Sequence, residues 1–268
     1  MDVYDFDSNL TSSFILKYGD DLRKDAAVLQ MFRFMNSLWE ENELYYHGKQ
    51  VQALTYACLP LGTEYGIIEL IPNCKSLQEI CEEKLKLQKE NQKNNRRASM
   101  VFGNDDALFQ LIATCAGSYI AAYVMGIRDR HYDNVLIRED GTVFHIDFGY
   151  MLGFVCVCVI CLLVFFEKVA GLDTNKFAIT SDLSKLMGHR YQEFVDIGQK
   201  AWLVLRENAQ ELLDYARVVF AFLYPEDTVE NFIKDVLLMH LDKDKAAELE
   251  KENTLLCNFS AMAMQRQN

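Results

Sequence analysis

Apolar and polar residues alternate along the first part of this chain with two different periods, so we expect both strands and helices there. A period of two is typical of a strand with one buried face, and steps of three and four residues are typical of an amphipathic helix. The helical spacing begins at Asp21 and continues through Trp39, with Leu22, Ala26 and Leu29 on its apolar face. The strand pattern occurs at 12–18, 52–57 and 65–71.

The middle of the chain predicts a buried helix followed by a β-hairpin. The segment 108–124 is almost uniformly apolar, as expected of a helix that is covered on all sides. Val135–Ile137 and Val143–Ile146 are short apolar runs on either side of Glu139-Asp-Gly141, which is a turn signal. Before the helix, 82–97 is rich in charge, and we expect a solvated helix end and loop there, with a lipid-contacting basic patch as the alternative.

The last third of the chain predicts helices alone. Apolar residues fall at helical steps in three segments, and Thr228 is a residue type that caps helix N-termini. The expected helices are 181–187, 191–224 as one long helix or a pair, and 228–242 capped by Thr228.

Composition agrees with a folded intracellular enzyme domain. The chain has 268 residues, of which 50% are hydrophobic and 25% charged, enough to bury one bilobal domain or two small ones. The net charge of −12 disfavours a nucleic-acid partner, which normally meets a basic face. It also provides no general attraction to anionic lipid, so an enzyme acting at a membrane would need a local patch or a partner protein.

The eight cysteines are scattered among apolar neighbours, which is typical of reduced thiols in the cytosol. Cys158 and Cys161 have the spacing of a metal-binding pair, but no second pair or histidine follows at a zinc-like distance, so we do not predict zinc. The N-terminal segment Met1–Asp7 is acidic and has no secretory-signal pattern.

Candidate chemistry is concentrated around the hairpin. Asp129-Arg-His-Tyr-Asp-Asn134 precedes its first strand, and Asp147-Phe-Gly149 follows its second, so the turn returns Asp147 beside Asn134. A carboxylate and an amide oxygen are suitable protein ligands for Mg²⁺, which binds through one or two such oxygens together with substrate phosphates. Asp129 and His131 are candidates for the base at an attacking hydroxyl. The pattern therefore predicts phosphoryl transfer.

Three motifs in this order carry a family resemblance. Gly19-Asp-Asp-Leu-Arg-Lys-Asp25, Asp129-Arg-His-Tyr-Asp-Asn134 and His145-Ile-Asp-Phe-Gly149 resemble those of the phosphatidylinositol 3-/4-kinase superfamily. The catalytic triplet has the inverted order of that family, Asp-Arg-His, where protein kinases have His-Arg-Asp. Asp20 in Gly-Asp-Asp-Leu-Arg resembles the lipid kinases rather than their protein-kinase relatives.

The resemblance implies an α+β, bilobal, protein-kinase-like fold with a small β-rich N-lobe and a larger, mostly helical C-lobe. By this resemblance 1–71 is a partial N-lobe with the hinge, and 72–268 is the C-lobe. It implies ATP and Mg²⁺ as cofactors and an inositol-ring hydroxyl of phosphatidylinositol or a phosphoinositide as the acceptor, with the 3-position favoured. A phosphatidylinositol 4-kinase, a related protein Ser/Thr kinase and a catalytically impaired interaction module stay open.

The resemblance also assigns site residues. Lys17 would contact the α-phosphate, Asp25 would help to organise the nucleotide pocket, and backbone groups near Glu69 and Leu70 would bind adenine. The expected catalytic residues are Asp129 and His131, with Arg130 bracing the loop, and the expected metal ligands are Asn134 and Asp147. The expected nucleotide-binding residues are Lys17, Asp25, Tyr56, Ile68, Glu69, Leu70, Ile71 and Ile146. The expected partners are a lipid at a membrane surface and a regulatory subunit, and the expected location is cytoplasmic and peripheral to membranes.

Three features depart from the family pattern. Arg128 stands where the 3-kinases usually have a small residue and some 4-kinases a basic one. No glycine-rich phosphate loop is found, so we expect Met1 to enter the upper lobe partway and the chain to be N-terminally truncated. The segment 154–166 is continuously apolar where a polar, basic activation loop is expected, and thirteen residues are too few to span a bilayer. We favour sequence foreign to the fold there, such as untranslated sequence read through, over a buried strand or a membrane-dipping loop.

Overall fold

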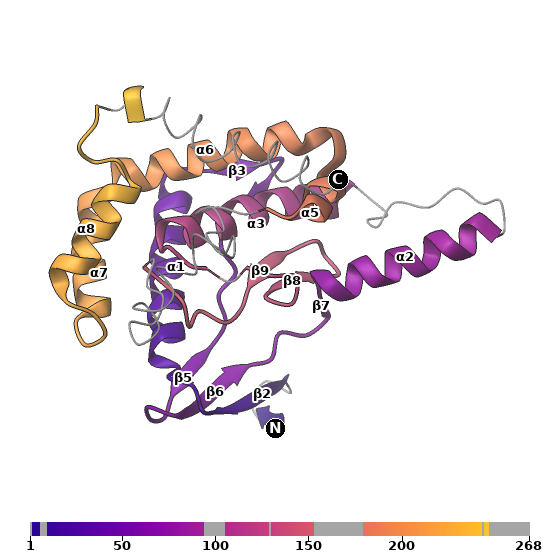
Figure 1. Cartoon of the computed structure of the whole chain (residues 1–268), viewed down its shortest axis with the longest axis horizontal. Helices are drawn as coiled ribbons and strands as arrows, with labels where there is room; N and C mark the ends of the chain where they lie inside the picture. The colour runs from indigo at the N-terminus through magenta and orange to yellow at the C-terminus, as the bar shows by residue number, and fades with distance from the viewer. Residues whose placement is uncertain are drawn as a thin grey trace, which may run out of the picture.

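The computed structural model of the protein describes residues 2–5, 10–93, 105–128, 130–152, 179–242 and 244–246. Within them the fold combines helices with small antiparallel sheets, as the α+β prediction requires. Strands β2, β5 and β6 lie at one end of the molecule and most helices gather at the other, as Figure 1 shows. Asp129 and the apolar segment 154–166 lie outside the described residues.

The first sheet has the strand order β1-β2-β6-β5, and all its pairs are antiparallel. Its strands are β1 (Asp2–Asp5), β2 (Leu10–Tyr18), β5 (Cys58–Pro60) and β6 (Tyr65–Glu69). The strands expected at 12–18 and 65–71 are therefore confirmed, with shifted ends. The prediction of a strand at 52–57 is wrong. The segment belongs to no strand, and at Ala53 a side chain pairs with the backbone instead, because the Asn36 amide donates to the Ala53 carbonyl and accepts from the Ala53 N–H, both at 2.8 Å.

The second sheet contains the predicted hairpin. Strands β8 (Val135–Arg138) and β9 (Val143–His145) pair with one another, and β7 (Cys74–Ser76), which the sequence pattern did not indicate, pairs with β8. Strand β9 is an edge strand, so its outer backbone groups need partners from elsewhere. Thr114 Oγ1 accepts the Val143 N–H at 2.9 Å, and Ser118 donates to the Val143 carbonyl at 3.1 Å.

Those two side chains belong to α3 (Asp105–Val124), which is the central helix of the molecule. Its length and composition would suffice to cross a membrane, but 72% of its most apolar window is buried inside the protein. α1 (Arg23–Glu41) and α6 (Tyr191–Glu207) cover it. The buried indole of Trp39 joins these two helices by donating to the Ala201 carbonyl at 2.9 Å. α3 is therefore a core helix, as its uniformly apolar sequence indicates.

The helical end of the chain follows the prediction except for the helix expected at 228–242, which differs in its cap and at both ends. α5 (Ser181–Met187) has the expected bounds, and the expected long helix is a pair, α6 and α7 (Ala209–Phe220), separated at Asn208. A short 3₁₀ helix, η1 (Gly188–Arg190), precedes α6. α8 (Glu226–Val236) begins directly after Pro225, so Thr228 lies within the helix and the prediction that it caps the N-terminus was wrong. Pro225 is the N-cap residue of this helix, and its carbonyl accepts the Val229 N–H at 3.3 Å.

Helix α2 (Leu77–Lys93) extends away from the rest of the molecule, and Figure 1 shows it projecting beyond the second sheet. Leu77 anchors its base, with no exposed surface, and Leu85 farther along is 55% exposed. The charged run 82–97 thus contains the end of this helix, which is helical as far as Lys93, and 94–97 lie outside the described residues. A small hairpin of β3 (Tyr45–Tyr46) and β4 (Lys49–Gln50) packs against α3.

Helix α3 also packs closely against the segment around Gln52, where a strand was expected. A Cβ atom added at Gly117 would lie 2.3 Å from the Gln52 carbonyl carbon and 2.4 Å from its oxygen. Backbone atoms cannot move away as easily as the end of a flexible side chain, so only glycine fits this approach. By contrast, a Cβ at Gly198 of α6 would meet only the Ile120 side chain, at an ordinary 3.9 Å.

We expect Gly117→Ala to lower the free energy of unfolding by about 1–3 kcal/mol, because the added methyl forces α3 away from the segment around Gln52. The matched control is Gly198→Ala, which should be neutral or stabilising by up to about 1 kcal/mol, because alanine favours a helix and finds space there. Urea unfolding followed by circular dichroism measures both. Equal stabilities for the two variants would contradict this account of the packing.

Candidate functional site

The site begins at Lys17, near the end of β2. Its register partner in β6 is Gly66. A Cβ atom at Gly66 would lie 2.7 Å from the Leu22 side chain and 2.7 Å from the Leu59 carbonyl oxygen. The missing side chain lets Leu22, fully buried before α1, pack across the sheet beside Lys17. The strand and the first helix are thereby held together, and Lys17 faces the turn that follows β9.

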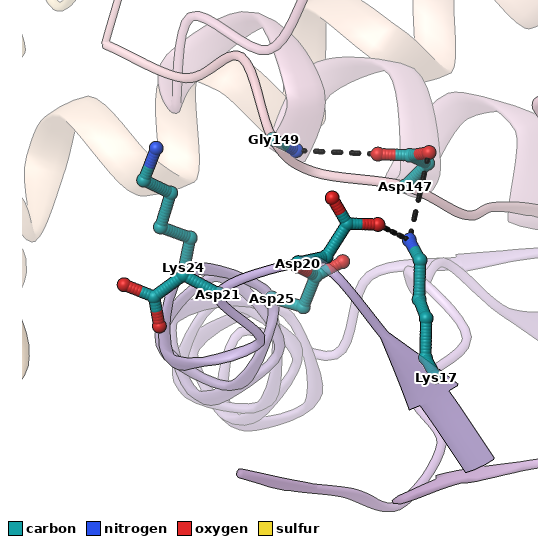
Figure 2. A pocket seen from close by; sticks show the side chains of 7 residues that line it. All are labelled: Lys17, Asp20, Asp21, Lys24, Asp25, Asp147 and Gly149. Atoms are coloured by element: carbon teal, nitrogen blue, oxygen red, sulfur yellow. Dashed lines mark hydrogen bonds and ion pairs between the residues drawn. The ribbon is translucent and has the colours of Figure 1, made fainter. Parts of the chain in front are cut away.

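Lys17 lies among carboxylates. Its Nζ is 2.9 Å from Asp20 Oδ2 and 3.8 Å from Asp147 Oδ2. Figure 2 shows these three side chains pointing toward one another, with Asp21 and Lys24 extending from the other side of the first turn of α1. Asp21 is held there by Arg23, whose Nε donates to it at 2.8 Å. Together they surround a cavity of about 80 Å³ lined by Lys17, Asp20, Asp21, Lys24, Asp25, Asp147 and Gly149.

The charges in this cluster shift one another's pKa values. Burial alone would lower the pKa of Lys17, but its hydrogen bond to Asp20 and the charges of Asp147 and Asp20 raise it. Lys17 is therefore protonated at neutral pH. Burial raises the pKa of Asp25, and the Phe148 hydrogen bond and the Lys17 charge offset this only in part. The cavity thus contains a fixed cation next to a carboxylate that is costly to ionise.

The turn after β9 is held by side chains from distant parts of the chain. Asp147 has a φ of 61°, in the left-handed region that non-glycine residues rarely occupy. Arg130 donates to the carbonyls of Ile146, at 2.7 Å, and Asp147. Asp25 Oδ1 accepts the Phe148 N–H at 3.1 Å, and Phe148 itself is fully buried, edge-on to Phe32 at 5.5 Å. Arg130 thus braces the turn as well as its own loop.

The hairpin brings Asn134 next to this turn, because the Ile146 N–H donates to the Asn134 carbonyl at 3.2 Å. Asn134 is buried and does not line the cavity, whereas Asp147 is 52% and Asp20 57% exposed at the side chain. Carboxylate oxygens that reach solvent at a cavity lined mainly by aspartates fit a hard ion such as Mg²⁺, which shares its coordination with phosphates. Within the described residues, no three His, Cys, Asp or Glu side chains form a metal site by themselves. Shared coordination of one ion by Asn134 and Asp147 stays a prediction.

His131 lies in the exposed part of the loop, with half of its side chain accessible. Its Nδ1 accepts the backbone N–H of Asp133 at 3.2 Å. A neutral imidazole in this arrangement carries its proton on Nε2, so that nitrogen can donate a hydrogen bond. Acting as a base through Nε2 would first require the proton to move to Nδ1.

The residues expected around adenine lie at the end of β6. The Glu69 N–H donates to the Ala57 carbonyl and the Leu70 N–H to the Ser13 carbonyl, both at 2.8 Å. These two N–H groups are used within the sheet, which leaves the Ile71 N–H and the Glu69 carbonyl as candidates for adenine. Ile68 is paired with both neighbouring strands. Tyr56 is buried close to the cluster, and its pKa is raised well above the ordinary value by burial and by the Asp25 charge.

Four cavity residues were absent from the predicted site: Asp20, Asp21, Lys24 and Gly149. The available signal was their position inside the two motifs that supplied Asp25 and Asp147. His145, the first residue of the last motif, is buried edge-on to Tyr119 at 4.7 Å. Neither of its ring nitrogens has a hydrogen-bond partner among the described residues, and burial holds its pKa well below the ordinary value. It is a neutral residue beneath the site.

Comparison with known proteins gives matches over most of the chain. Residues 11–106 and 92–220 match the family described as phosphatidylinositol 3- and 4-kinase. Phosphatidylinositol 3-kinase 3 of Dictyostelium discoideum is 30% identical over 260 residues, which cover 89% of this chain and 14% of that protein. Phosphatidylinositol 3-kinase piki-1 of Caenorhabditis elegans is 30% identical over 253 residues, covering 89% of this chain and 15% of that protein.

A human relative gives a similar picture. Phosphatidylinositol 4-phosphate 3-kinase C2 domain-containing subunit beta is 31% identical over 229 residues, which cover 79% of this chain and 13% of that protein. The chain therefore spans about a seventh of the length of the curated relatives it matches.

The raised pKa of Asp25 makes stability depend on pH, and Asp25→Asn tests this. A carboxyl with a higher pKa folded than unfolded binds more protons in the folded state, so its ionisation destabilises the fold as the pH rises above 3.8. We expect the variant, which keeps an oxygen for the Phe148 N–H, to gain stability relative to the wild type as the pH rises from 3 to 7. Thermal unfolding at each pH measures the difference, and a constant difference would contradict the prediction.

Proposed function

Because the chain belongs to the phosphatidylinositol 3- and 4-kinase family, we propose that it transfers the γ-phosphate of ATP to a hydroxyl of an inositol lipid. The observation that carries this proposal is the cluster in which Lys17 lies within 3.8 Å of Asp147 and 2.9 Å of Asp20. Phosphoryl transfer depends mainly on holding the phosphates and neutralising their charge. A lysine and an accessible carboxylate at one cavity provide the groups for both.

Each residue of the cluster has a role in this proposal. Lys17, protonated at neutral pH, would exchange Asp20 for a phosphate oxygen of ATP. Asp147 and Asn134 would hold Mg²⁺, which when bound neutralises charge on the phosphate oxygens. Arg130 and Asp25 keep the Asp147 turn in place through the backbone bonds described above. Ile71 and Glu69 would bind adenine at the other end of the nucleotide.

The reaction is an in-line substitution at the γ-phosphorus. The hydroxyl oxygen of the lipid forms a bond to phosphorus, the bond from phosphorus to the bridging oxygen breaks, and ADP leaves. The hydroxyl proton passes to Asp129 or His131. The Nδ1 contact of His131 favours an orienting role for this residue, because its Nε2 then donates rather than accepts. Asp129 is accordingly the preferred base.

We further propose the two-lobed arrangement of kinases, with 1–71 in the N-lobe and 72–268 in the C-lobe. The position of β2, β5 and β6 at one end of the molecule, with most helices at the other, supports this division (Figure 1). The nucleotide would bind where β2 and the β9 turn face each other.

The favoured acceptor is the 3-hydroxyl of phosphatidylinositol or a phosphoinositide. The names of the three relatives support this choice, since each is described as a 3-kinase of phosphatidylinositol or of its 4-phosphate. Such a substrate lies in a membrane, so we propose a cytoplasmic protein that associates peripherally with membranes. With a net charge of −12, the chain is not attracted to anionic lipid as a whole, which favours recruitment by a partner such as a regulatory subunit.

A direct assay tests the proposal. The chain is incubated with labelled ATP, Mg²⁺ and vesicles of phosphatidylinositol, and the lipid products are separated by thin-layer chromatography. Labelled phosphatidylinositol 3-phosphate is the expected product, and the 4-phosphate would instead assign a 4-kinase. Label in a serine- and threonine-containing peptide but not in lipid would assign a protein kinase. Calorimetry with Mg²⁺ and ATP tests the remaining alternative, a catalytically impaired interaction module. Absence of nucleotide binding would support that alternative.

We expect Asp147→Asn to lower kcat at least about 100-fold, because the amide removes the charge that would hold Mg²⁺. Asparagine tolerates the left-handed backbone at this position, so the free energy of unfolding should change by less than about 0.5 kcal/mol. Lipid phosphorylation and urea unfolding measure the two effects.

The matched control for this prediction is Asp196→Asn, which makes the same chemical change on the exposed face of α6. Its rate should equal that of the wild type. Retained lipid phosphorylation in Asp147→Asn would remove the metal assignment.

A further inference from the structure

We propose that Tyr132 and Asp182 form a positioning pair that fixes the direction of His131. The pair joins the catalytic loop to helix α5, two segments that lie 50 positions apart in the sequence. This inference deepens the proposed function and rests on it, because it assumes that His131 acts on the attacking hydroxyl.

The contact between the two residues is direct. The Tyr132 hydroxyl donates to Asp182 Oδ2 at 2.8 Å, and Asp182 Oδ1 accepts from Lys185 at 3.1 Å. Burial raises the pKa of Asp182, but the hydrogen bonds from Tyr132 and Lys185 lower it by more, so the carboxylate is ionised at neutral pH. A hydroxyl donating to a carboxylate makes a charge-assisted bond, about twice as strong as a neutral one.

Tyr132 is the anchored residue of its part of the loop. Its side chain is partly buried against the core, whereas His131 and Asp133 on either side have side chains that are 50% and 69% exposed. Its carbonyl is also held, because the Gln78 N–H at the start of α2 donates to it at 3.3 Å. The loop is thus fixed at Tyr132 from both its backbone and its ring.

Asp182, the other residue of the pair, lies on a helix that is itself capped and packed against the core. Thr180 caps α5 by accepting the Leu183 N–H at 3.3 Å, and both Leu183 and Met187 are buried. Asp182 lies in the first turn of this capped helix. It can therefore hold the Tyr132 hydroxyl in one place.

The pair matters for His131 because Tyr132, one of its two members, is next to His131 in the chain. Displacing the Tyr132 ring would turn the peptide that carries His131, and a shift of about 1 Å in a reacting group can cost about 100-fold in rate. Tyr132 and Asp182 touch neither the lipid nor the nucleotide in this account. They act only by positioning His131.

Tyr132→Phe removes the hydroxyl and leaves the ring, and Asp182→Ala removes its acceptor. We expect each variant to lower kcat for lipid phosphorylation about tenfold without changing KM for ATP. The double variant should be no slower than either single one, because both remove the same bond. Tyr45→Phe makes the matched chemical change on the distant, exposed β3 hairpin and should keep the wild-type kcat and KM.

A second measurement does not depend on activity. Nitrogen-15 labelling of the five histidines gives imidazole spectra in which His131 is assigned by its loss in His131→Gln. We expect the His131 signals to shift or broaden in Tyr132→Phe and Asp182→Ala, and to be unchanged in Tyr45→Phe. Unchanged His131 signals would overturn the positioning pair, as would a wild-type kcat in both variants or rate effects that multiply in the double variant. A wild-type chain that phosphorylates no lipid would instead overturn the proposed function, and the spectra would still decide whether the pair positions His131.

Discussion

The site depends on how the backbone is held between Ile146 and Gly149. Asp147 occupies the left-handed region, which costs an L-residue roughly 1–2 kcal/mol and persists only where the surroundings determine it. Here Arg130 binds the two carbonyls of Ile146 and Asp147, Asp25 binds the Phe148 N–H, and the Phe148 ring is fully buried. These contacts fix the turn, and the turn directs the Asp147 carboxylate toward Lys17.

The same contacts explain why the fold keeps the carboxylate of Asp25 in a buried position. Asp25 is only 5% exposed, and burial disfavours its ionised form. It is also the group that joins the first helix to the turn, while Lys17 on the neighbouring strand contributes a compensating charge. The two motifs that contain Asp25 and Asp147 therefore form one electrostatic unit, in which carboxylates outnumber the central lysine and suit a cation.

Much of this could be predicted from the sequence, and the failures have physical causes. The hairpin and α5 follow from local pattern, and the ordered motifs bring Lys17, Asp25 and Asp147 together in the fold. The segment 52–57 has a strand pattern but is paired by the Asn36 side chain, which periodicity cannot reveal. Thr228 is a residue type that often caps helices, but Pro225 is the N-cap residue of α8 and Thr228 lies inside the helix. The sequence identified Asp20 as a residue typical of the family but did not predict its contact with Lys17, because that contact depends on the bend between β2 and α1.

The hydrogen bond between the Ile146 N–H and the Asn134 carbonyl has a consequence for how the molecule folds. A single hairpin connects these residues, so the chain entropy lost in bringing them together is small and the ladder can close within microseconds. The bond from Phe148 to Asp25 spans 123 positions and closes a far larger loop. The contact between Asn134 and Ile146 can therefore form locally and early. The contact between Phe148 and Asp25 of the first helix forms only with the slower, non-local assembly of the whole domain.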